Sequence, residues 1–385
     1  MNHVIQRPSL WRRLRPLWRG LDAPLLLACL WLMAWGLLAM YSIGFDHGSR
    51  FADHARNFAI GAAVMLAVAQ VPAQKLTRLA LPLYAAGLLL LIAVALFGIT
   101  KKGATRWLNL GVTVIQPSEL LKIATPLMLA WWFQLREGQL KLLDFVIAFV
   151  LLGLPFGLIA KQPDLGTGLL VLFAGLYVIY FAGLSWKLII PLLSAALIGI
   201  GALIAYEPEI CQDEVKWVLL KDYQKTRVCT LLDPHKDPLG KGFHVLQGEI
   251  AIGSGGLTGK GFMQGTQTHL EFIPERTTDF LFAAFAEEFG LLGALALLAG
   301  FSALILRGLV IAANAPTLFE RLLAGSITLS FFSYVFVNMG MVIGLLPVVG
   351  VPLPFMSYGG TAMVMLGLSL GLLLAIGRSR SLIQR

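Results

Sequence analysis

The sequence contains few charged residues: Asp, Glu, Lys and Arg make up 13% of its 385 residues. Ordinary soluble domains carry about 25%, so this scarcity argues against a soluble globular protein. Hydrophobic residues account for 57% of the chain, and its mean hydropathy is +0.78. These values predict an integral membrane protein that crosses the bilayer several times. In such a chain, basic residues that orient helices beside anionic lipid explain the net charge of +9 better than nucleic-acid binding does.

Cysteine is also scarce, with three residues in the chain. Cys29 lies in an apolar run and is expected to be a packing residue. Cys211 and Cys229 both lie in a long polar segment. In an oxidising compartment a disulfide between them would close a short loop and stabilise the fold by about 3 kcal/mol. Two free thiols are the alternative.

Apolar runs of about twenty residues, the length needed to cross a bilayer, recur along the chain. Lysines and arginines concentrate in the segments that lie inside if the N-terminus is cytoplasmic, which favours that orientation. We therefore predict an all-α polytopic membrane protein with both termini cytoplasmic and with the whole chain, 1–385, in a single membrane domain. The ten expected spans are residues 22–43, 57–71, 78–98, 117–134, 144–160, 166–182, 187–205, 279–306, 320–344 and 359–377.

The longest polar segment, 206–278, separates the seventh and eighth expected helices and is predicted to form a large external loop. It ends at Asp279, which opens the next apolar run. A carboxylate at the mouth of a membrane helix is costly to keep ionised, so Asp279 is a candidate functional residue. Glu287 and Glu288 follow about two turns later, and at least one of them is expected to join a polar network inside the bundle.

A glycine-rich run lies within the external loop at residues 251–261. Glycines this dense permit close backbone approach to a ligand, and beside Lys260 they could form an anion-binding nest. The run lacks the spacing of a nucleotide-binding loop. The alternative is a compact loop folded over the membrane surface.

Other external segments also carry polar residues. Glu119 and Lys122 are three residues apart, so they share one helical face near the membrane boundary, either as a self-neutralising ion pair or as a functional pair. Arg106 precedes them, and Asp164 lies in the next external turn. A turn rich in proline and glycine, 347–360, follows the ninth span. Together with the large loop, these four segments are expected to converge on one surface.

Several motifs are similar to those of the SEDS family of shape, elongation, division and sporulation proteins. The forms of residues 270–276 (LEFIPER) and 351–355 (VPLPF) are closest to the RodA branch of that family. The resemblance covers nearly the whole chain. Its other motifs are Asp233-Pro234, 237–240 (DPLG), 251–256 (AIGSGG), 265–267 (GTQ), 274–276 (PER), 278–280 (TDF) and 357–360 (SYGG).

The resemblance implies a ten-helix peptidoglycan glycosyltransferase of the bacterial inner (cytoplasmic) membrane, with its active site and the 206–278 loop on the periplasmic side. It would polymerise lipid II into β-1,4-linked glycan strands for cell elongation and rod shape, releasing undecaprenyl pyrophosphate. A class B penicillin-binding protein would crosslink the product, beside other proteins of the elongation complex. In one departure from the family pattern, Thr277 stands where the family usually has histidine, which removes an imidazole beside the carboxylate.

The reaction that the resemblance implies suggests roles for individual residues. Asp279 matches the family's essential aspartate, and we expect it to accept the proton of the attacking sugar 4-hydroxyl. Arg106 and Lys122 are expected to stabilise the departing pyrophosphate, with Glu119 orienting Lys122. Trp107 would either stack on a sugar face or anchor its loop at the membrane interface.

Asp164, Glu275 and Ser357 are secondary candidates. The two carboxylates are expected to hold loops rather than to perform chemistry, and Ser357 has no evident base nearby in sequence to make it a nucleophile. A divalent cation, Mg²⁺ or Mn²⁺, could bind through Asp279 and the substrate phosphates, although no residue spacing demands one. Three histidines of the external loop lack metal-ligand spacing and are expected to be solvated: His235, His244 and His269.

Two other functions remain open on the sequence alone. Ten helices with charges at the membrane boundary would suit a flippase for lipid-linked precursors, and a noncatalytic scaffold for a penicillin-binding protein is the third interpretation. The enzyme is favoured because a carrier needs a polar path through the midplane. Residues 148–159 contain no polar side chain, and residues 362–375 contain only Ser369. A scaffold would leave Asp279 and Lys122 without a role.

Overall fold

The computed structural model describes residues 20–45, 48–101, 104–109, 114–212, 215, 217, 222–238, 240, 242–270, 272–273 and 275–383. Within these residues, ten helices are at least 17 residues long, and each overlaps one of the ten expected spans. They are α2 (Ala23–Ile43), α3 (Arg50–Val68), α4 (Ala73–Phe97), α5 (Pro117–Leu135), α6 (Leu142–Lys161), α7 (Leu165–Phe181), α8 (Trp186–Ala205), α13 (Leu281–Ala313), α14 (Leu318–Val342) and α15 (Gly360–Ile383).

Seven of these helices are long and apolar enough to cross a membrane by themselves: α2, α4, α6, α8, α13, α14 and α15. The helix α7 is apolar but shorter, at 17 residues. The remaining two, α3 and α5, carry ionisable residues in their first turns, among them Asp53 and Glu119. The predicted class, a polytopic helical membrane protein, is confirmed. The start of α3 differs from the prediction because the helix continues through a polar first turn that an apolar run cannot reveal.

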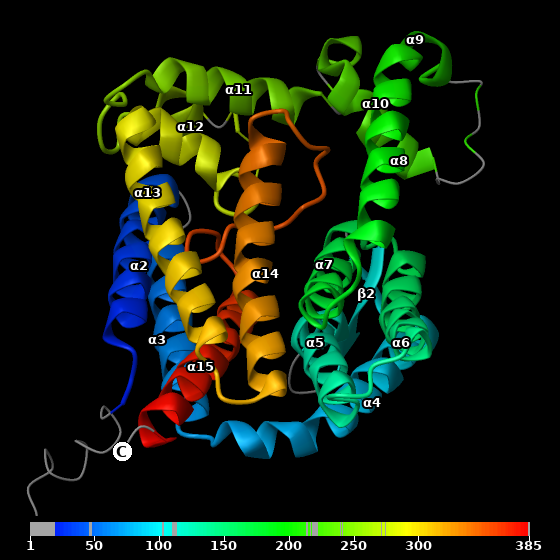
Figure 1. Cartoon of the computed structure of the whole chain (residues 1–385). Coiled ribbons are helices and arrows are strands. Elements are labelled where there is room, and N and C mark those ends of the chain that lie inside the picture. The colour runs from blue at the N-terminus through cyan, green and yellow to red at the C-terminus, as the bar shows by residue number, and fades with distance from the viewer. Residues whose placement is uncertain are drawn as a thin grey trace, which may run out of the picture.

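The helix α14 joins two groups of helices (Figure 1). On one side α2 and α15 pack with α3 and α13, on the other α4 to α7 pack together, and α14 contacts α13, α5 and α7. Small residues permit the close contact of α3 with α15: a methyl group added at Gly367 would lie 2.1 Å from the carbonyl oxygen of Gly61. In contrast, α8 has no buried residue and stands apart from the bundle.

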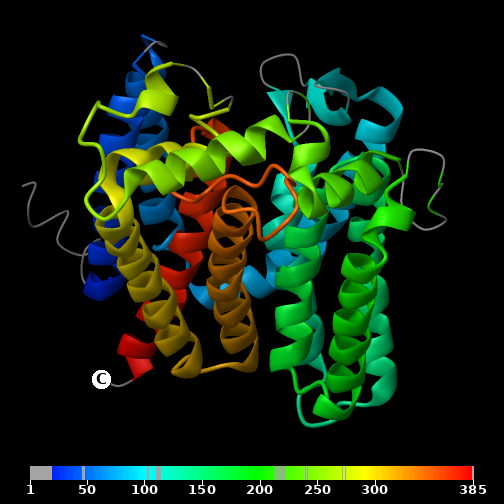
Figure 2. The ribbon, with the colours of Figure 1, turned by 90° about the horizontal axis from the view of Figure 1, so that it is seen from above.

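One end of the bundle is covered by the segment between α8 and α13. It contains α9 (Glu207–Ile210), α10 (Asp222–Leu232), the 3-10 helix η1 (Pro234–Lys236), α11 (Phe243–Gly255) and α12 (Thr266–His269). Figure 2 shows α11 running across the ends of α13 and α14, which it contacts. We call this the capped end; the last residues of α15 lie at the opposite end (Figure 1). The predicted loop is therefore a compact and largely helical cover.

The expected disulfide is present and links Cys211, after α9, to Cys229 in α10. Its sequence separation is 18 residues, so on the chain-entropy account it stabilises the cover by about 3 kcal/mol. Cys29 is buried and free, as expected of a packing residue.

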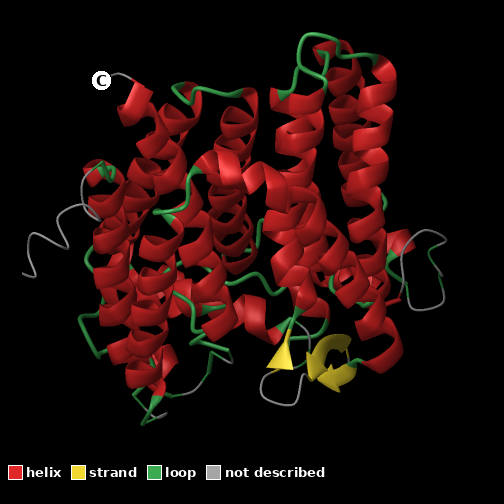
Figure 3. Ribbon diagram, turned by 90° about the horizontal axis from the view of Figure 1, so that it is seen from below, coloured by secondary structure: helices red, strands yellow, loops and turns green. Residues whose placement is uncertain are grey.

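A small antiparallel sheet between α4 and α5 was not predicted from the sequence. Its strands are β1 (Ile99–Lys101), β2 (Ala104–Asn109) and β3 (Val114–Ile115), in the order β1-β2-β3 (Figure 3). The strands are too short to produce a clear alternating pattern, and β-branched residues such as Ile99 and Thr105 are the main sequence signal. The sheet matters because its central strand carries Arg106.

The helix α13 is interrupted near its start, at Gly290 (φ 63°, ψ −163°). The loop after α11 enters this break: the amide of Lys260 donates to the carbonyl of Glu287 at 2.9 Å, and the amide of Leu291 donates to the carbonyl of Gly256 at 3.0 Å. Glycine is needed at the break because its φ lies in the left-handed region.

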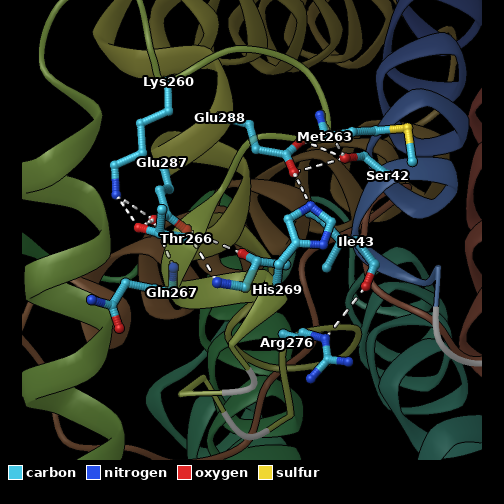
Figure 4. A network of polar contacts seen from close by, with 11 residues as sticks. Ser42, Ile43, Lys260, Met263, Thr266, Gln267, His269, Arg276, Glu287 and Glu288 are labelled. Carbon is cyan, nitrogen blue, oxygen red and sulfur yellow. Dashed lines mark hydrogen bonds and ion pairs between the residues drawn. The ribbon is translucent and has the colours of Figure 1, made fainter.

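Glu287 and Glu288 both join a polar network at this break, as expected of at least one of them (Figure 4). Glu287 Oε1 accepts from the Lys260 ammonium at 2.6 Å and from the Gln267 amide at 2.9 Å. Glu288 accepts from the hydroxyl of Ser42 at 2.6 Å. The first residues of the glycine-rich run, 251–255, form the end of α11, and the ion pair of Lys260 with Glu287 favours a compact cover over an anion-binding nest.

Two of the three histidines in the cover are half-buried instead of fully solvated, which differs from the expectation. The ring of His269 packs 4.4 Å from that of Phe45, and its Nε2 lies 4.0 Å from Glu288. His244 packs 5.8 Å from Phe280; desolvation lowers its pKa, and the nearby Glu275 acts in the opposite direction. His235 is exposed, as expected. The difference arises because α11 and α12 fold back onto the bundle, a contact that local sequence does not encode.

Candidate active site

A cleft of about 190 Å³ opens where the external segments meet. Asp279 lies just before α13, whose first turns contact α11, so the cleft is at the capped end. Three of the four external segments supply lining residues, and the fourth, the turn at Asp164, reaches the cleft through its ion pair with Arg106. The lining residues are Arg106, Gln116, Glu119, Lys122, Thr167, Leu170, Thr278, Asp279, Gly350, Val351, Pro352, Tyr358, Gly359, Thr361 and Ala362.

The half-buried Asp279 is held in place through the backbone of its own segment. The amide of Tyr358 donates to the carbonyl of Thr277 at 2.8 Å, the Ser357 hydroxyl donates to that of Thr278 at 2.6 Å, and the Asn338 amide donates to that of Asp279 at 2.9 Å. These three bonds fix consecutive peptide groups, so the position of the carboxylate is determined by the loop before α15 and by α14.

Gly350 lies beside the Asp279 carboxylate and lines the same cleft. A methyl group added at this glycine would lie 3.3 Å from Asp279 Oδ2, and its φ of +73° is in the region that favours glycine. The absence of a side chain at Gly350 therefore leaves the carboxylate accessible from the cleft.

Lys122 and Glu119 form an ion pair with Nζ and Oε1 2.6 Å apart, on the first turns of α5. Both side chains are largely shielded, with exposed fractions of 9% and 12%. The ammonium of Lys122 also lies 5.1 Å from the centroid of the Tyr334 ring. The predicted pairing and its position at the cleft are observed, whereas the two residues' roles remain predictions.

Arg106 projects from β2 into the same cleft and lies 3.4 Å from Asp164. Asp164 is 4% exposed, accepts from Gln116 at 2.8 Å and caps α7 through the amide of Thr167 at 3.3 Å. It therefore holds loops together, as expected. The Nε of Arg106 is buried and has no hydrogen-bond partner among the described residues.

Three other candidates have positions that bear on their expected roles. Trp107 is not among the residues lining the cleft, because adjacent strand residues point to opposite faces, and this favours the loop-anchor interpretation. Glu275 is exposed, has a φ of +55° and accepts from Thr278 at 2.8 Å, so it stabilises a turn. Ser357 is 2% exposed; its hydroxyl accepts from the Leu353 amide at 2.8 Å and holds Thr278. Its position is structural.

Sequence reasoning missed several residues of the site. Tyr358 lines the cleft and belongs to a motif that was noted only for its family resemblance. Asn338 binds two carbonyls, those of Asp279 and Val351, from the interior of α14. The available signal was an amide side chain within the apolar run 335–343 at the end of this helix.

A second, apolar cavity of about 70 Å³ adjoins the cleft and shares Glu119 and Lys122 with it. It extends between α5, α7, α14 and α15, where Ile123, Leu170, Phe331 and Met363 line it. The polar cleft is thus bounded by apolar side chains on the side that faces the interior of the helix bundle.

The fold and the cleft define a multi-pass membrane protein with acidic and basic side chains gathered at one end of its helix bundle. The model of the FtsW/RodA/SpoVE family, described as cell cycle protein, matches residues 23–382. The chain belongs to this family.

Two similar proteins are named as peptidoglycan glycosyltransferases. The chain is 45% identical over 366 residues to the peptidoglycan glycosyltransferase MrdB of Escherichia coli K12, covering 95% of each chain. It is 39% identical over 313 residues to MrdB of Helicobacter pylori J99, covering 80% of this chain and 77% of the relative. The chain is accordingly a peptidoglycan glycosyltransferase, and of the three interpretations that the sequence left open the enzyme is confirmed.

Solved structures agree with this assignment. Thermus thermophilus RodA, a rod shape determining protein, matches with a TM-score of 0.69 at 28% identity, covering 94% of this chain and 98% of that one. A peptidoglycan synthase complex that coordinates polymerization and crosslinking matches with a TM-score of 0.78 at 30% identity, covering 94% and 99%. The ten-helix arrangement derived from the sequence is therefore a known fold.

Proposed function

We propose that the enzyme polymerises lipid II at the periplasmic face of the bacterial inner membrane, for cell elongation and rod shape. The observation that carries this proposal is that Asp279, Lys122 and Arg106 line a single cleft, although they lie just before α13, on α5 and on β2. The capped end, where the cleft opens, is the side that the distribution of basic residues places outside the cytoplasm.

Asp279 is the proposed general base. The 4-hydroxyl of one sugar attacks the anomeric carbon of another, a new carbon–oxygen bond forms with inversion, and the hydroxyl proton passes to the Asp279 carboxylate. The bond between the anomeric carbon and the phosphate oxygen breaks, and undecaprenyl pyrophosphate leaves with the electron pair. The fixed peptide groups of residues 277–279 hold the base in one position, which favours a reactive geometry.

Lys122 and Arg106 are proposed to stabilise the negative charge that gathers on the leaving group. Fixed cations act most strongly where little water is present, and the side chain of Lys122 is only 9% exposed. Arg106 lines the same cleft, where its ion pair with Asp164 holds the guanidinium in place. Glu119 keeps Lys122 in place through its 2.6 Å contact.

The residues of this site would supply few ligands to a divalent cation. Among the described residues, no group of three His, Cys, Asp or Glu side chains could hold one, and Glu119 and Asp164 are already paired with cations. Mg²⁺ or Mn²⁺ would therefore be held by Asp279 with substrate phosphates and water, and would neutralise charge on the pyrophosphate. Chelation followed by titration with Mg²⁺ or Mn²⁺ measures whether polymerisation depends on it.

A class B penicillin-binding protein is the proposed partner, which would crosslink the strands, within a larger elongation complex. The likeness to a synthase complex that coordinates polymerization and crosslinking supports this proposal. Copurification of the two proteins from membranes, with the penicillin-binding protein tagged, tests it.

The decisive experiment compares Asp279→Asn with Glu275→Gln. Both changes replace a carboxylate by an amide of similar shape, and Glu275 lies in the same turn but is exposed. Each purified variant is incubated with its partner, whose own active site is blocked, and with labelled lipid II. We expect Asp279→Asn to lose about 10² to 10⁴ of the polymerisation rate, the range of general-base catalysis, and Glu275→Gln to retain most of it. Wild-type rates from a folded Asp279→Asn protein would place the base elsewhere.

A further inference from the structure

Arg50, the first residue of α3, lies between two segments that form the wall of the cleft. Its Nη1 donates a 2.7 Å hydrogen bond to the hydroxyl of Thr277. The centre of the same guanidinium lies 4.7 Å from the centroid of the Tyr358 ring. Thr277 is 5% exposed and Arg50 is half-buried, so both contacts are shielded from water.

These two partners are joined to the proposed base. Thr277 lies two residues before Asp279, and its carbonyl accepts from the amide of Tyr358 at 2.8 Å. Tyr358 lines the cleft beside Asp279. Arg50 therefore contacts both sides of the hydrogen bond that connects the aspartate's segment to the loop before α15.

The chemistry of the guanidinium suits this position. Its planar group can donate in its own plane to the Thr277 hydroxyl while one face lies over the Tyr358 ring. A lysine ammonium is a point charge that does not present a flat face.

We propose that Arg50 is a positioning residue of the glycosyltransferase reaction, which fixes Thr277 and Tyr358 and thereby orients Asp279 in the cleft. The inference rests on the proposed role of Asp279. Arg50 itself does not line the cleft among the described residues, so it acts through its two partners and not on the substrate.

The test measures kcat and KM for lipid II polymerisation in Arg50→Ala, Arg50→Lys and Thr277→Val, each with the partner present and blocked as above. The matched control is Arg56→Ala on the same helix, whose side chain is 65% exposed and pairs with Asp53. We expect Arg50→Ala to lower kcat about 10- to 100-fold, the effect of a small misplacement of a catalytic group, with little change in KM. Arg50→Lys should restore part of kcat, and the control should match the wild type.

A double-mutant comparison separates positioning from general stability. If Arg50 acts through Thr277, adding Thr277→Val to Arg50→Ala should lower kcat by less than the product of the two single effects. Melting temperatures are recorded for every variant. If Arg50→Ala fails to fold, the milder Arg50→Lys and Thr277→Val variants decide: wild-type kcat in both overturns the proposal.

The outcomes distinguish this inference from the proposed function. An inactive Asp279→Asn with wild-type kcat in a folded Arg50→Ala would overturn the role of Arg50 alone. An active Asp279→Asn would overturn the proposed base and with it this inference. A fall in kcat that follows the melting temperature equally in Arg50→Ala, Arg50→Lys and the control would show a structural role and also overturn the proposal.

Discussion

The pair of Lys122 and Glu119 allows the stability and the activity of the enzyme to be separated. The perturbation is Lys122→Met, alone and combined with Glu119→Gln. Methionine and glutamine approximately preserve the volumes of the original side chains. The single change leaves a carboxylate without its cation, whereas the double change removes both charges from the same place.

The magnitudes follow from the burial of the pair. With exposed fractions of 9% for Lys122 and 12% for Glu119, removing one partner should destabilise by about 3 to 5 kcal/mol, because an uncompensated charge remains buried. Removing both avoids that penalty, so the double variant should unfold within about 1 to 2 kcal/mol of the wild type. Activity should not recover in parallel, since a fixed electrostatic group at the reacting charge contributes about 10² to 10³ in rate.

Two quantities are measured for each variant. Stability is measured by thermal unfolding in detergent, and activity is measured by polymerisation of labelled lipid II. We expect Lys122→Met to be unstable and inactive, and the double variant to be stable and still at least about 100-fold slower than the wild type. A double variant that regains both stability and rate would refute the reasoning, because Lys122 would then be a structural residue only.

Three further predictions concern the wall and the cover of the cleft. Gly350→Ala should lower the polymerisation rate at least about tenfold, because its methyl group would lie 3.3 Å from Asp279 Oδ2 at a φ of +73°; an unchanged rate would show that the loop adapts. Ser357→Ala should lose about 1 to 3 kcal/mol of stability and keep part of its activity, since its hydroxyl holds Thr278. Complete inactivity in a folded protein would instead implicate the hydroxyl in the chemistry. Reduction of the disulfide should destabilise the α10 region by about 3 kcal/mol, which is measurable as faster amide hydrogen exchange in that region. In a variant lacking both cysteines, the reductant should leave the exchange rate unchanged.

Much of the fold could be predicted because membrane helices are determined by local composition. The ten spans follow from apolar runs alone, and helix ends carry local signals such as Pro117 at the first turn of α5. The small sheet and the helices of the cover could not be predicted in the same way. They depend on contacts with the bundle, as the break at Gly290 shows, where a loop about thirty residues earlier supplies hydrogen bonds to α13.

The candidate site was partly predictable for a related reason. Charged residues at membrane boundaries are rare enough to be noticed singly, which identified Asp279, Lys122 and Arg106. Their partners were not identifiable, because the contacts are distant in sequence: Arg50 and Thr277 are 227 residues apart, and Asn338 and Asp279 are 59 apart. The role of a polar residue outside any motif can be inferred only when the fold shows which residues it contacts.

The shape of the site also explains why it suits catalysis better than transport. A carrier for a lipid-linked sugar needs polar groups along its path through the bilayer. Here Glu119 and Lys122 stand at the boundary between the polar cleft and the apolar cavity, and beyond them the walls are mainly residues such as Ile123, Phe331 and Leu366. A sugar diphosphate moving past that boundary would lose its hydration with few partners to replace it. We therefore expect the polar part of a substrate to remain at the capped end, beside the proposed base Asp279 and the two proposed cations, Lys122 and Arg106.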